Sequence, residues 1–309
     1  MAALISVIAP VFNEEGNLQM MTDRLIRALK PLKMDYEILF INDGSSDSSL
    51  KILESFAQKN RKLKVLSFSR NFGHQTAVAA GLDYCKGDCV VIIDADLQDP
   101  PELISDLVEK WKEGFEVVYA QRSMRKGESY LKRLTASVFY RLLQKLANVN
   151  IPVDTGDFRL MDRKVVDVIR SMPERNKFIR GMVSWAGFRQ VGVQFERSER
   201  HTGETKYTYG KMLRFALTGL TYFSQTPLQL ASYLGFAVSA ATFVYGLYVA
   251  YIAVFTNETV RGWPSIVLIV LFLGGIQLLT LGILGEYMGR ISEEIKQRPI
   301  YVVAKKVNI

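Results

Sequence analysis

The first hundred residues alternate short apolar runs with stretches in which apolar residues recur every three or four positions. Short runs of apolar residues suit buried strands, whereas the three-to-four spacing suits helices that pack by one face. This pattern predicts strands at 4–10, 36–43, 64–69 and 89–94, and helices at 17–29, from the 45–49 serine cluster onward, and at 74–85. Strands that alternate with helices predict an α/β domain with a mostly parallel sheet covered on both faces.

Polar residues follow each predicted strand. In open α/β sheets, ligands bind beyond the carboxyl ends of the strands. The candidate site segments are therefore Pro10–Glu15, Asn42–Asp47, Arg70–Gly73 and Asp94–Asp99. We expect these four segments to converge at one edge of the sheet.

Two longer apolar segments, 228–255 and 266–284, contain no charged residue. Each exceeds the roughly 18 residues that indicate a membrane-spanning helix. A buried helix of a soluble protein would explain the second segment alone, but two adjacent segments favour a transmembrane hairpin. The predicted organisation is a cytosolic domain over 1–227, a two-helix hairpin over 228–288 and a cytosolic tail over 289–309.

The basic residues around the hairpin predict its orientation. Cytoplasmic segments next to membrane spans are enriched in Lys and Arg. The link between the spans has a single basic residue, Arg261, and the first fifteen residues lack the basic start of a cleavable signal. Basic residues stand on both outer sides of the hairpin, namely Lys206, Lys211 and Arg214 before it and Arg290, Lys296 and Arg298 after it. Both termini and the large domain are therefore expected in the cytoplasm.

Two further stretches, 128–147 and 209–223, combine helical apolar spacing with Lys and Arg. Such helices lie in the membrane interface, although the same periodicity also suits ordinary core helices. Their place before the hairpin favours the interface. The glycines at 274, 275 and 282–289 could permit close helix packing within the hairpin or between subunits of a homo-oligomer.

The formal net charge of +8 predicts an anionic partner, which could be a nucleic acid, a phosphate-bearing ligand or an anionic membrane. Cys85 and Cys89 are the only cysteines, too few for a disulfide framework or a four-ligand zinc site, and they are predicted to be free thiols. The histidines, His74 and His201, are interpreted as polar loop residues, of which His74 could lie near a diphosphate.

The segment "DADLQDP" at 94–100 places three carboxylates within six positions and is a candidate metal site. Asp94 and Asp96 point the same way in an extended segment and would repel each other unless a cation lay between them. Carboxylate oxygens favour Mg²⁺ or Mn²⁺, which would in turn bind a diphosphate. A solvated acidic loop would explain this motif alone. Glu14 could accept ribose hydroxyls and Asp43 a base N–H, and acidic turns at three successive strand ends favour a nucleotide site.

Taken together, "PVFNEE", "INDGSSD", "SRNFGH", "DADLQDP", "GDFRLM" and "LFLGGIQLLTLGILGEYMGR" resemble inverting glycosyltransferase family 2 over nearly the whole chain. The resemblance is strongest to its polyprenyl-phosphate branch, that of the bactoprenol glucosyltransferases and the related dolichol-phosphate mannose synthases. It implies a GT-A fold, a nucleotide-sugar donor, an undecaprenyl phosphate acceptor and a place in the bacterial inner membrane.

The resemblance also implies roles for individual residues. Pro10, Glu14 and Asp43 match nucleoside-binding positions, and Asp94, Asp96 and Gln98 match the metal and diphosphate site. Asp157 in "GDFRLM" matches a catalytic or acceptor-orienting position. Arg122, Arg133 and Ser137 resemble positions that hold the acceptor phosphate, and Arg200 and Lys206 resemble a basic loop over the donor phosphates.

The chemistry of the expected acceptor limits what the protein must supply. A phosphate monoester has a second pKa near 6, so its oxygen is already a nucleophile at cytosolic pH and needs no strong base. Catalysis then requires charge neutralisation, by a cation at Asp96 for the leaving diphosphate and by Arg122 and Arg133 for the incoming phosphate. A single displacement would convert an α-linked donor into a β-linked polyprenyl-phosphate sugar.

The sequence leaves the sugar open. The nearest resemblance favours UDP-glucose, with 4-amino-4-deoxy-arabinose and GDP-mannose donors as alternatives. A membrane-anchored nucleic-acid-binding protein would suit the charge but not the acidic strand ends, so no nucleic acid partner is expected. A processive polysaccharide synthase would need more membrane spans and a Q-x-x-R-W motif, which the sequence lacks.

Overall fold

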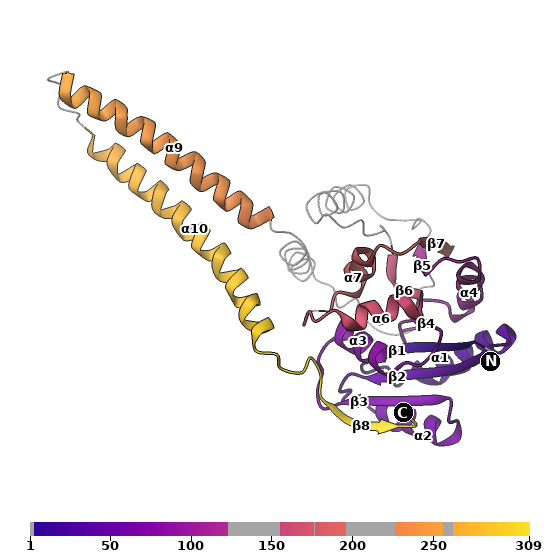
Figure 1. Ribbon diagram of the computed structural model, residues 1–309. Helices are drawn as coiled ribbons and strands as arrows, with labels where there is room; N and C mark the ends of the chain where they lie inside the picture. The colour runs from indigo at the N-terminus through magenta and orange to yellow at the C-terminus, as the bar shows by residue number, and fades with distance from the viewer. Residues whose placement is uncertain (1–2, 123–154, 176, 196–225, 256–261) are drawn as a thin grey trace, which may run out of the picture. The chain divides into compact units, whose positions relative to one another are not determined.

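The computed structural model describes residues 3–122, 155–175, 177–195, 226–255 and 262–309 (Figure 1). The described residues divide into two compact units. The first, here called the catalytic unit, comprises those up to 195 together with 298–309, and the second comprises those from 226 to 297.

One mixed sheet runs through the catalytic unit. Its strands are β1 (Leu4–Val11), β2 (Asp35–Asn42), β3 (Leu63–Phe68), β4 (Cys89–Ile92), β5 (Val117–Arg122), β6 (Thr155–Asp162), β7 (Gln190–Phe195) and β8 (Val303–Val307), in the order β7-β5-β6-β4-β1-β2-β3-β8. Pairing is parallel for β1–β2, β2–β3, β1–β4 and β5–β7. It is antiparallel for β3–β8, β4–β6 and β5–β6. The prediction of an α/β fold with a mostly parallel sheet is confirmed.

Helices cover both faces of the sheet. Those of the catalytic unit are α1 (Leu18–Leu29), α2 (Ser49–Lys59), α3 (His74–Tyr84), α4 (Ile104–Lys112), α6 (Arg163–Ser171) and α7 (Ile179–Ala186), with short 3₁₀ turns η1 (Lys30–Leu32) and η2 (Pro101–Leu103). Apolar side chains of α1, α2 and α4 pack on one face, and those of α3, α6 and α7 on the other. In β1, Val7 faces the first layer and Ile8 the second, which explains why the central strands are apolar throughout.

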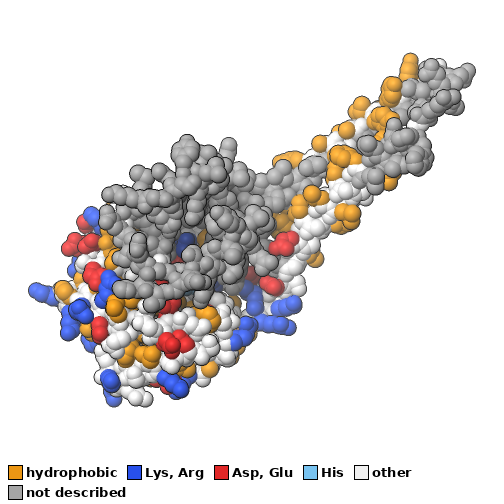
Figure 2. Space-filling view, turned by 180° about the vertical axis from the view of Figure 1, so that it is seen from behind, with side chains coloured by type: hydrophobic (Ala, Val, Ile, Leu, Met, Phe, Trp, Pro, Cys, Tyr) orange, Lys and Arg blue, Asp and Glu red, His pale blue; other side chains and the backbone are white. Residues whose placement is uncertain are grey.

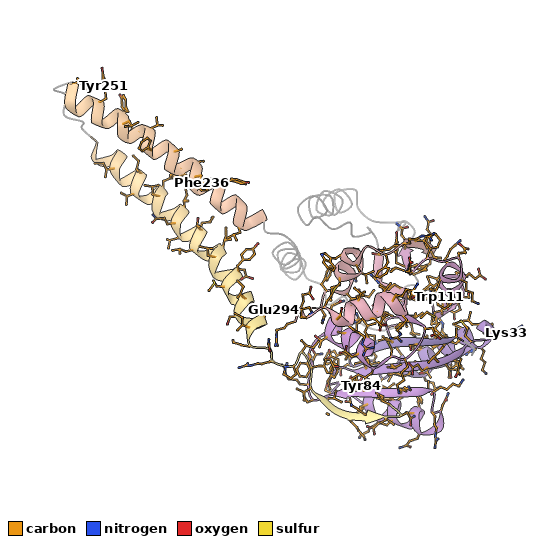
Figure 3. The ribbon with its side chains drawn as sticks, in the orientation of Figure 1. Lys33, Tyr84, Trp111, Phe236, Tyr251 and Glu294 are labelled. Carbon is orange, nitrogen blue, oxygen red and sulfur yellow. The ribbon has the colours of Figure 1, made fainter. Side chains whose placement is uncertain are left out.

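The second unit consists of two long helices, α9 (Thr226–Phe255) and α10 (Trp263–Ile295), which lie alongside each other in opposite directions (Figure 1). Large apolar side chains are exposed along them, as the orange side chains in Figure 2 show. Phe236 and Tyr251, both exposed, project outward from α9 (Figure 3). Among the described residues, Phe272–Ile295 in α10 is long and apolar enough to cross a membrane. The apolar stretch within α9, Gly235–Tyr248, is shorter.

Several sequence-based predictions fall outside the described residues. They are the interfacial helices at 128–147 and 209–223, most of the link between the hairpin helices, and Arg133, Ser137, Arg200, His201 and Lys206. The C-terminal tail, in contrast, is described, and its strand β8 extends the sheet of the catalytic unit.

Candidate active site

The loop at the end of β3 is held by the carboxylate at the end of β2. Asp43 is buried, and its Oδ1 and Oδ2 accept hydrogen bonds from the backbone N–H groups of Phe72 (2.7 Å) and Gly73 (3.0 Å). Burial raises the pKa of Asp43, against the opposing effect of these two hydrogen bonds. Asp43 therefore fixes the segment that leads into α3, a role that the sequence did not indicate.

Close backbone contact explains the glycine next to Asp43. Gly44 has a φ of +66°, and a Cβ atom there would lie 2.4 Å from the backbone carbon of Arg70. Only glycine combines this left-handed conformation with so close an approach. The loops after β2 and β3 thus pack directly against each other.

The loop after β1 interlocks with the turn after β2. The backbone N–H groups of Asn13 and Glu14 donate to the hydroxyls of Ser45 and Ser49, both at 3.0 Å. The Glu14 carboxylate accepts a hydrogen bond of 2.6 Å from the side chain of Asn17, and Pro10 is buried within β1. The two acidic turns predicted from sequence therefore form one surface.

The acidic segment after β4 lies at the same edge of the sheet. The Oδ1 atom of Asp96 accepts a hydrogen bond of 3.1 Å from the backbone N–H of Gln98. Leu97, between them, has a left-handed backbone with a φ of +63°. The Oδ1 atom of Asp94 is buried and accepts no hydrogen bond from the described residues. Burial, together with the charges of Asp157 and Asp96, raises the pKa of Asp94. A carboxylate pair in which one buried oxygen accepts no hydrogen bond among the described residues, although His74 lies 3.5 Å from it, fits a hard divalent cation.

The described residues contain no cluster of three or more acidic, His or Cys side chains arranged for a metal. Two carboxylates still suit Mg²⁺ or Mn²⁺, because such ions usually bind one or two carboxylates and take their other ligands from water and substrate phosphates. Asp94 and Asp96 are thus the residues that could hold a cation, and they would do so together with a diphosphate.

Asp157, in β6, is saturated by donors from two helices. Its Oδ1 accepts the Nε–H of Arg180 at 2.6 Å, and its Oδ2 lies 2.9 Å from the Nε2 of Gln75 and 3.1 Å from that of His74. The same His74 atom lies 3.5 Å from Asp94 Oδ1. His74 therefore joins Asp157 to the acidic segment after β4.

The electrostatics of this cluster favour its charged forms. Burial alone would raise the pKa of Asp157, but the charges and hydrogen bonds of Arg180 and His74 hold it well below its usual value. Desolvation opposes protonation of His74, but the Asp157 hydrogen bond and the charges of Asp94 and Asp157 raise its pKa to about 9. At neutral pH the cluster thus contains an ionised Asp157 between two cations.

Sequence reasoning missed two members of this cluster, because neither Gln75 nor Arg180 was singled out. It placed the start of a helix at His74, the first residue of α3, and allowed this side chain a place near a diphosphate, but interpreted it as a polar loop residue and did not predict its contact with Asp157. A single charge in "FIRGMVSW", otherwise apolar or small, was the available signal for Arg180. The structure brings Asp94 and Asp157 to either side of His74, whose Nε2 lies 3.5 Å from the first and 3.1 Å from the second. Asp43 and Asp96 are near enough for charge effects, because the charge of His74 lowers the pKa of Asp43 and that of Asp96 raises the pKa of Asp94.

Gln98 is buried in the segment after β4. Arg122 ends β5, where its backbone is opposite Phe195 of β7. Arg122 therefore borders the region beyond the carboxyl ends of these two parallel strands.

Known proteins match this chain over nearly its full length. Residues 6–170 match the family model described as "Glycosyl transferase family 2". The chain is 51% identical to "Uncharacterized glycosyltransferase YkcC" of Bacillus subtilis (strain 168), covering 98% of this chain and 94% of the relative. It is 44% identical to "Bactoprenol glucosyl transferase" of Shigella phage SfII, covering 97% of each.

A solved structure of glucosyl-3-phosphoglycerate synthase from Mycobacterium tuberculosis, in complex with Mn²⁺, uridine-diphosphate and glucosyl-3-phosphoglycerate, is also similar. It aligns with a TM-score of 0.48 and 22% identity, over 72% of this chain and 80% of that one.

Proposed function

The chain belongs to glycosyl transferase family 2, and from this premise we propose that it transfers glucose from UDP-glucose to undecaprenyl phosphate with inversion. The product would be a β-linked polyprenyl-phosphate sugar, made at the cytoplasmic face of a bacterial inner membrane for later glycan or O-antigen modification. The 44% identity to a bactoprenol glucosyl transferase over 97% of the chain supports the glucosyl donor and the lipid acceptor.

The observation that carries the proposal is the arrangement of charge around His74. Its Nε2 lies 3.5 Å from Asp94 and 3.1 Å from Asp157, at the edge where β1, β2 and β4 end. An acidic pair suited to a cation therefore adjoins a cationic side chain, and a nucleoside diphosphate with its metal needs both.

A bound Mg²⁺ or Mn²⁺ would neutralise the diphosphate charge that develops as the sugar leaves. Asp94 and Asp96 would hold it, with Gln98 fixing the Asp96 carboxylate through its backbone N–H. Glu14 and Asp43 line the nucleoside side of the site, where Asp43 keeps the loop of Phe72 and Gly73 in place.

Asp157 acts in this proposal by positioning its neighbours. A carboxylate that already accepts three hydrogen bonds and has a lowered pKa is a weak proton acceptor. The acceptor phosphate brings its own nucleophilic oxygen, so no proton needs to be removed. Asp157 would instead hold His74 and Arg180 at the places where they stabilise phosphate charge.

Arg122, Arg133 and Ser137 would hold the acceptor phosphate in line with the anomeric carbon, and Arg200 and Lys206 would close over the donor phosphates. A basic fork binds a phosphate at two oxygens and so fixes its direction of approach. Arg122 is available for this role at the end of β5.

Membrane attachment would bring the site to its lipid. α10 contains a stretch of membrane-crossing length, and α9 exposes large apolar side chains, among them Tyr233, Phe236 and Phe243. We therefore include a transmembrane hairpin with both termini in the cytoplasm, helped by interfacial helices at 128–147 and 209–223, in the proposal. A homo-oligomer through the glycines of α10 is a further prediction.

A donor panel tests the choice of sugar. Purified full-length protein would be incubated with undecaprenyl phosphate, Mn²⁺ and radiolabelled UDP-glucose, GDP-mannose or UDP-4-amino-4-deoxy-arabinose in parallel. The proposal predicts that UDP-glucose labels the lipid phase fastest and that the product carries a β linkage. Preference for another donor would leave the reaction class intact but replace the sugar.

A further inference from the structure

The C-terminal strap, defined as residues 298–309, belongs to the catalytic unit although it follows α10 in the chain. Its strand β8 pairs antiparallel with β3, with Val307 opposite Val65 and Val303 opposite Phe68. Figure 1 shows β8 along the outer side of β3. The chain thus returns to the sheet after the hairpin and adds its final strand.

The distal part of the strap is fastened to the sheet edge. The side-chain amide of Asn308 donates to the carbonyls of Ala57 (2.7 Å) and Leu63 (2.9 Å). Lys305 forms an ion pair of 2.7 Å with Glu54. Lys306 lies 4.6 Å from the ring of Tyr84, which is labelled in Figure 3. These contacts fasten β8, which pairs with Val65–Phe68 of β3, to β3 itself and to the neighbouring helices α2 and α3.

The proximal part of the strap contacts the loop that forms the candidate site. A register shift between Ser67 and Phe68 marks the point where β3 leaves the regular ladder. Beyond it, the backbone N–H of Ser69 donates to the carbonyl of Val302 at 3.0 Å. The pairing with the strap therefore continues past the end of β3 into the loop.

Aromatic contacts extend this connection towards Asp43. The Tyr301 ring stacks on Phe68 with a centroid distance of 5.1 Å and an interplanar angle of 17°. Phe68 in turn meets Phe72 edge to face at 5.7 Å. The hydroxyl of Tyr301 donates to Asp83 of α3 at 2.8 Å, which fixes the ring between the loop and that helix.

Phe72 connects this aromatic series to the site. Its N–H donates to Asp43, and the next residue but one, His74, contacts both Asp94 and Asp157. Displacement of Phe72 would consequently move a donor of Asp43 and the first residue of α3 together. Because packed aromatic side chains have few alternative arrangements, the position of Tyr301 limits that of the loop.

We propose that the C-terminal strap is a positioning element of the donor site, in which Tyr301 and Val302 hold the Ser69–Gly73 loop in the conformation that receives the nucleotide. The inference rests on the proposed function for the identity of that nucleotide. It assigns to the end of the chain, beyond the membrane hairpin, a part in donor binding. Tyr301 acts through Phe68 and Phe72 and does not itself touch the donor.

The test compares Tyr301→Ala, Tyr301→Phe and Lys305→Ala in the full-length chain, with UDP and Mn²⁺ as the calorimetric probe. Tyr301→Ala should weaken UDP binding about 3- to 10-fold, as expected for the loss of one aromatic contact. It should raise the KM for UDP-glucose and leave the KM for undecaprenyl phosphate unchanged. Tyr301→Phe keeps the stacked ring and should bind UDP nearly as well as the wild type.

Lys305→Ala is the matched control, because it removes an ion pair from the same strap without touching the loop. A purely structural role for the strap would lower the melting temperature in both variants and leave the UDP affinity of each folded protein unchanged, which would overturn the inference. If Tyr301→Ala does not fold, Tyr301→Leu retains apolar volume without a ring and carries the same expectation.

Hydrogen exchange gives a readout that needs no ligand. The amides of Phe72 and Gly73 should exchange faster in Tyr301→Ala than in the wild type and Lys305→Ala, and equal rates would contradict the inference. If the wild-type protein bound no UDP, the proposal of a UDP-sugar donor would be wrong. The hydrogen-exchange comparison would still show whether the strap positions the loop.

Discussion

Arg180, in α7, donates a hydrogen bond of 2.6 Å from its Nε to the Oδ1 of Asp157, in β6. The pair is part of the candidate site and is completed by His74 and Gln75 from α3. A carboxylate that holds two cationic side chains in place affects the site through their positions. The interaction should therefore behave as a unit when its members are changed.

Asp157→Asn and Arg180→Ala test this coupling. Each should lower turnover by on the order of 100-fold, because either change removes a partner from the charges that remain in the cluster. UDP affinity should fall by less than turnover, because Asp43 keeps its partners although His74, which Asp157 holds beside Asp94, loses a contact. The double variant should be little worse than either single one in a kinetic double-mutant cycle. Additive losses would show that the two residues act independently.

The acidic pair predicts a metal requirement. Asp96→Asn should abolish turnover and remove the Mn²⁺ dependence of UDP binding, and Asp94→Asn should be nearly as severe, because both carboxylates serve one diphosphate site. Calorimetry with and without Mn²⁺ gives a measurement separate from turnover. Full activity of the wild type in EDTA is the outcome that this prediction excludes.

Membrane topology can be measured with a single introduced cysteine. Cys85 and Cys89 are buried, and burial raises their pKa values to about 11 and about 12, so both should resist maleimide at neutral pH. Ser265→Cys, close to the link between α9 and α10, should then be labelled by an impermeant maleimide added outside intact spheroplasts. Labelling only after lysis would place the link in the cytoplasm and reverse the proposed orientation.

Stability should depend on a buried carboxylate far from the site. Glu37 accepts hydrogen bonds from Ser6 Oγ at 2.5 Å and the backbone N–H of Lys86 at 2.7 Å, and it pairs with Lys64. Burial would raise its pKa, but these partners lower it overall. Glu37→Gln should reduce the free energy of unfolding at pH 7 by about 3 kcal/mol, since it leaves Lys64 half-buried without its partner.

The pH dependence of this effect has a definite sign. A lowered pKa means that the stabilisation is fully present above the unfolded value of 4.5 and is lost as the pH falls through the folded value. The difference between wild type and Glu37→Gln should thus be constant from pH 7 to about 5 and shrink at lower pH. Asp35→Asn, which breaks an exposed pair with Lys62, is the control and should have a smaller effect at every pH. A difference that does not change down to pH 3 would contradict the assignment.

The parallel half of the sheet was readable from sequence, whereas the antiparallel half was not. Apolar runs such as "CVVIID" identify central strands because both faces of these strands are buried. β8 reads "VAKKV", with exposed lysines, and becomes a strand only because the edge of β3 accepts it. Likewise, acidic strand ends pointed to Asp43 and Asp94, but the partnership of Arg180 with Asp157 depends on tertiary packing that no local spacing encodes.

Transfer of radiolabel from UDP-glucose to undecaprenyl phosphate by the purified full-length protein is the most direct test of the proposed reaction. With Mn²⁺ present, label should enter the organic phase as a single acid-labile glycolipid with a β linkage, and Asp96→Asn, purified in the same way, should give none. If neither UDP-glucose nor any other nucleotide sugar labelled the lipid, while the protein was folded and bound UDP, the chain would not be a polyprenyl-phosphate glycosyltransferase.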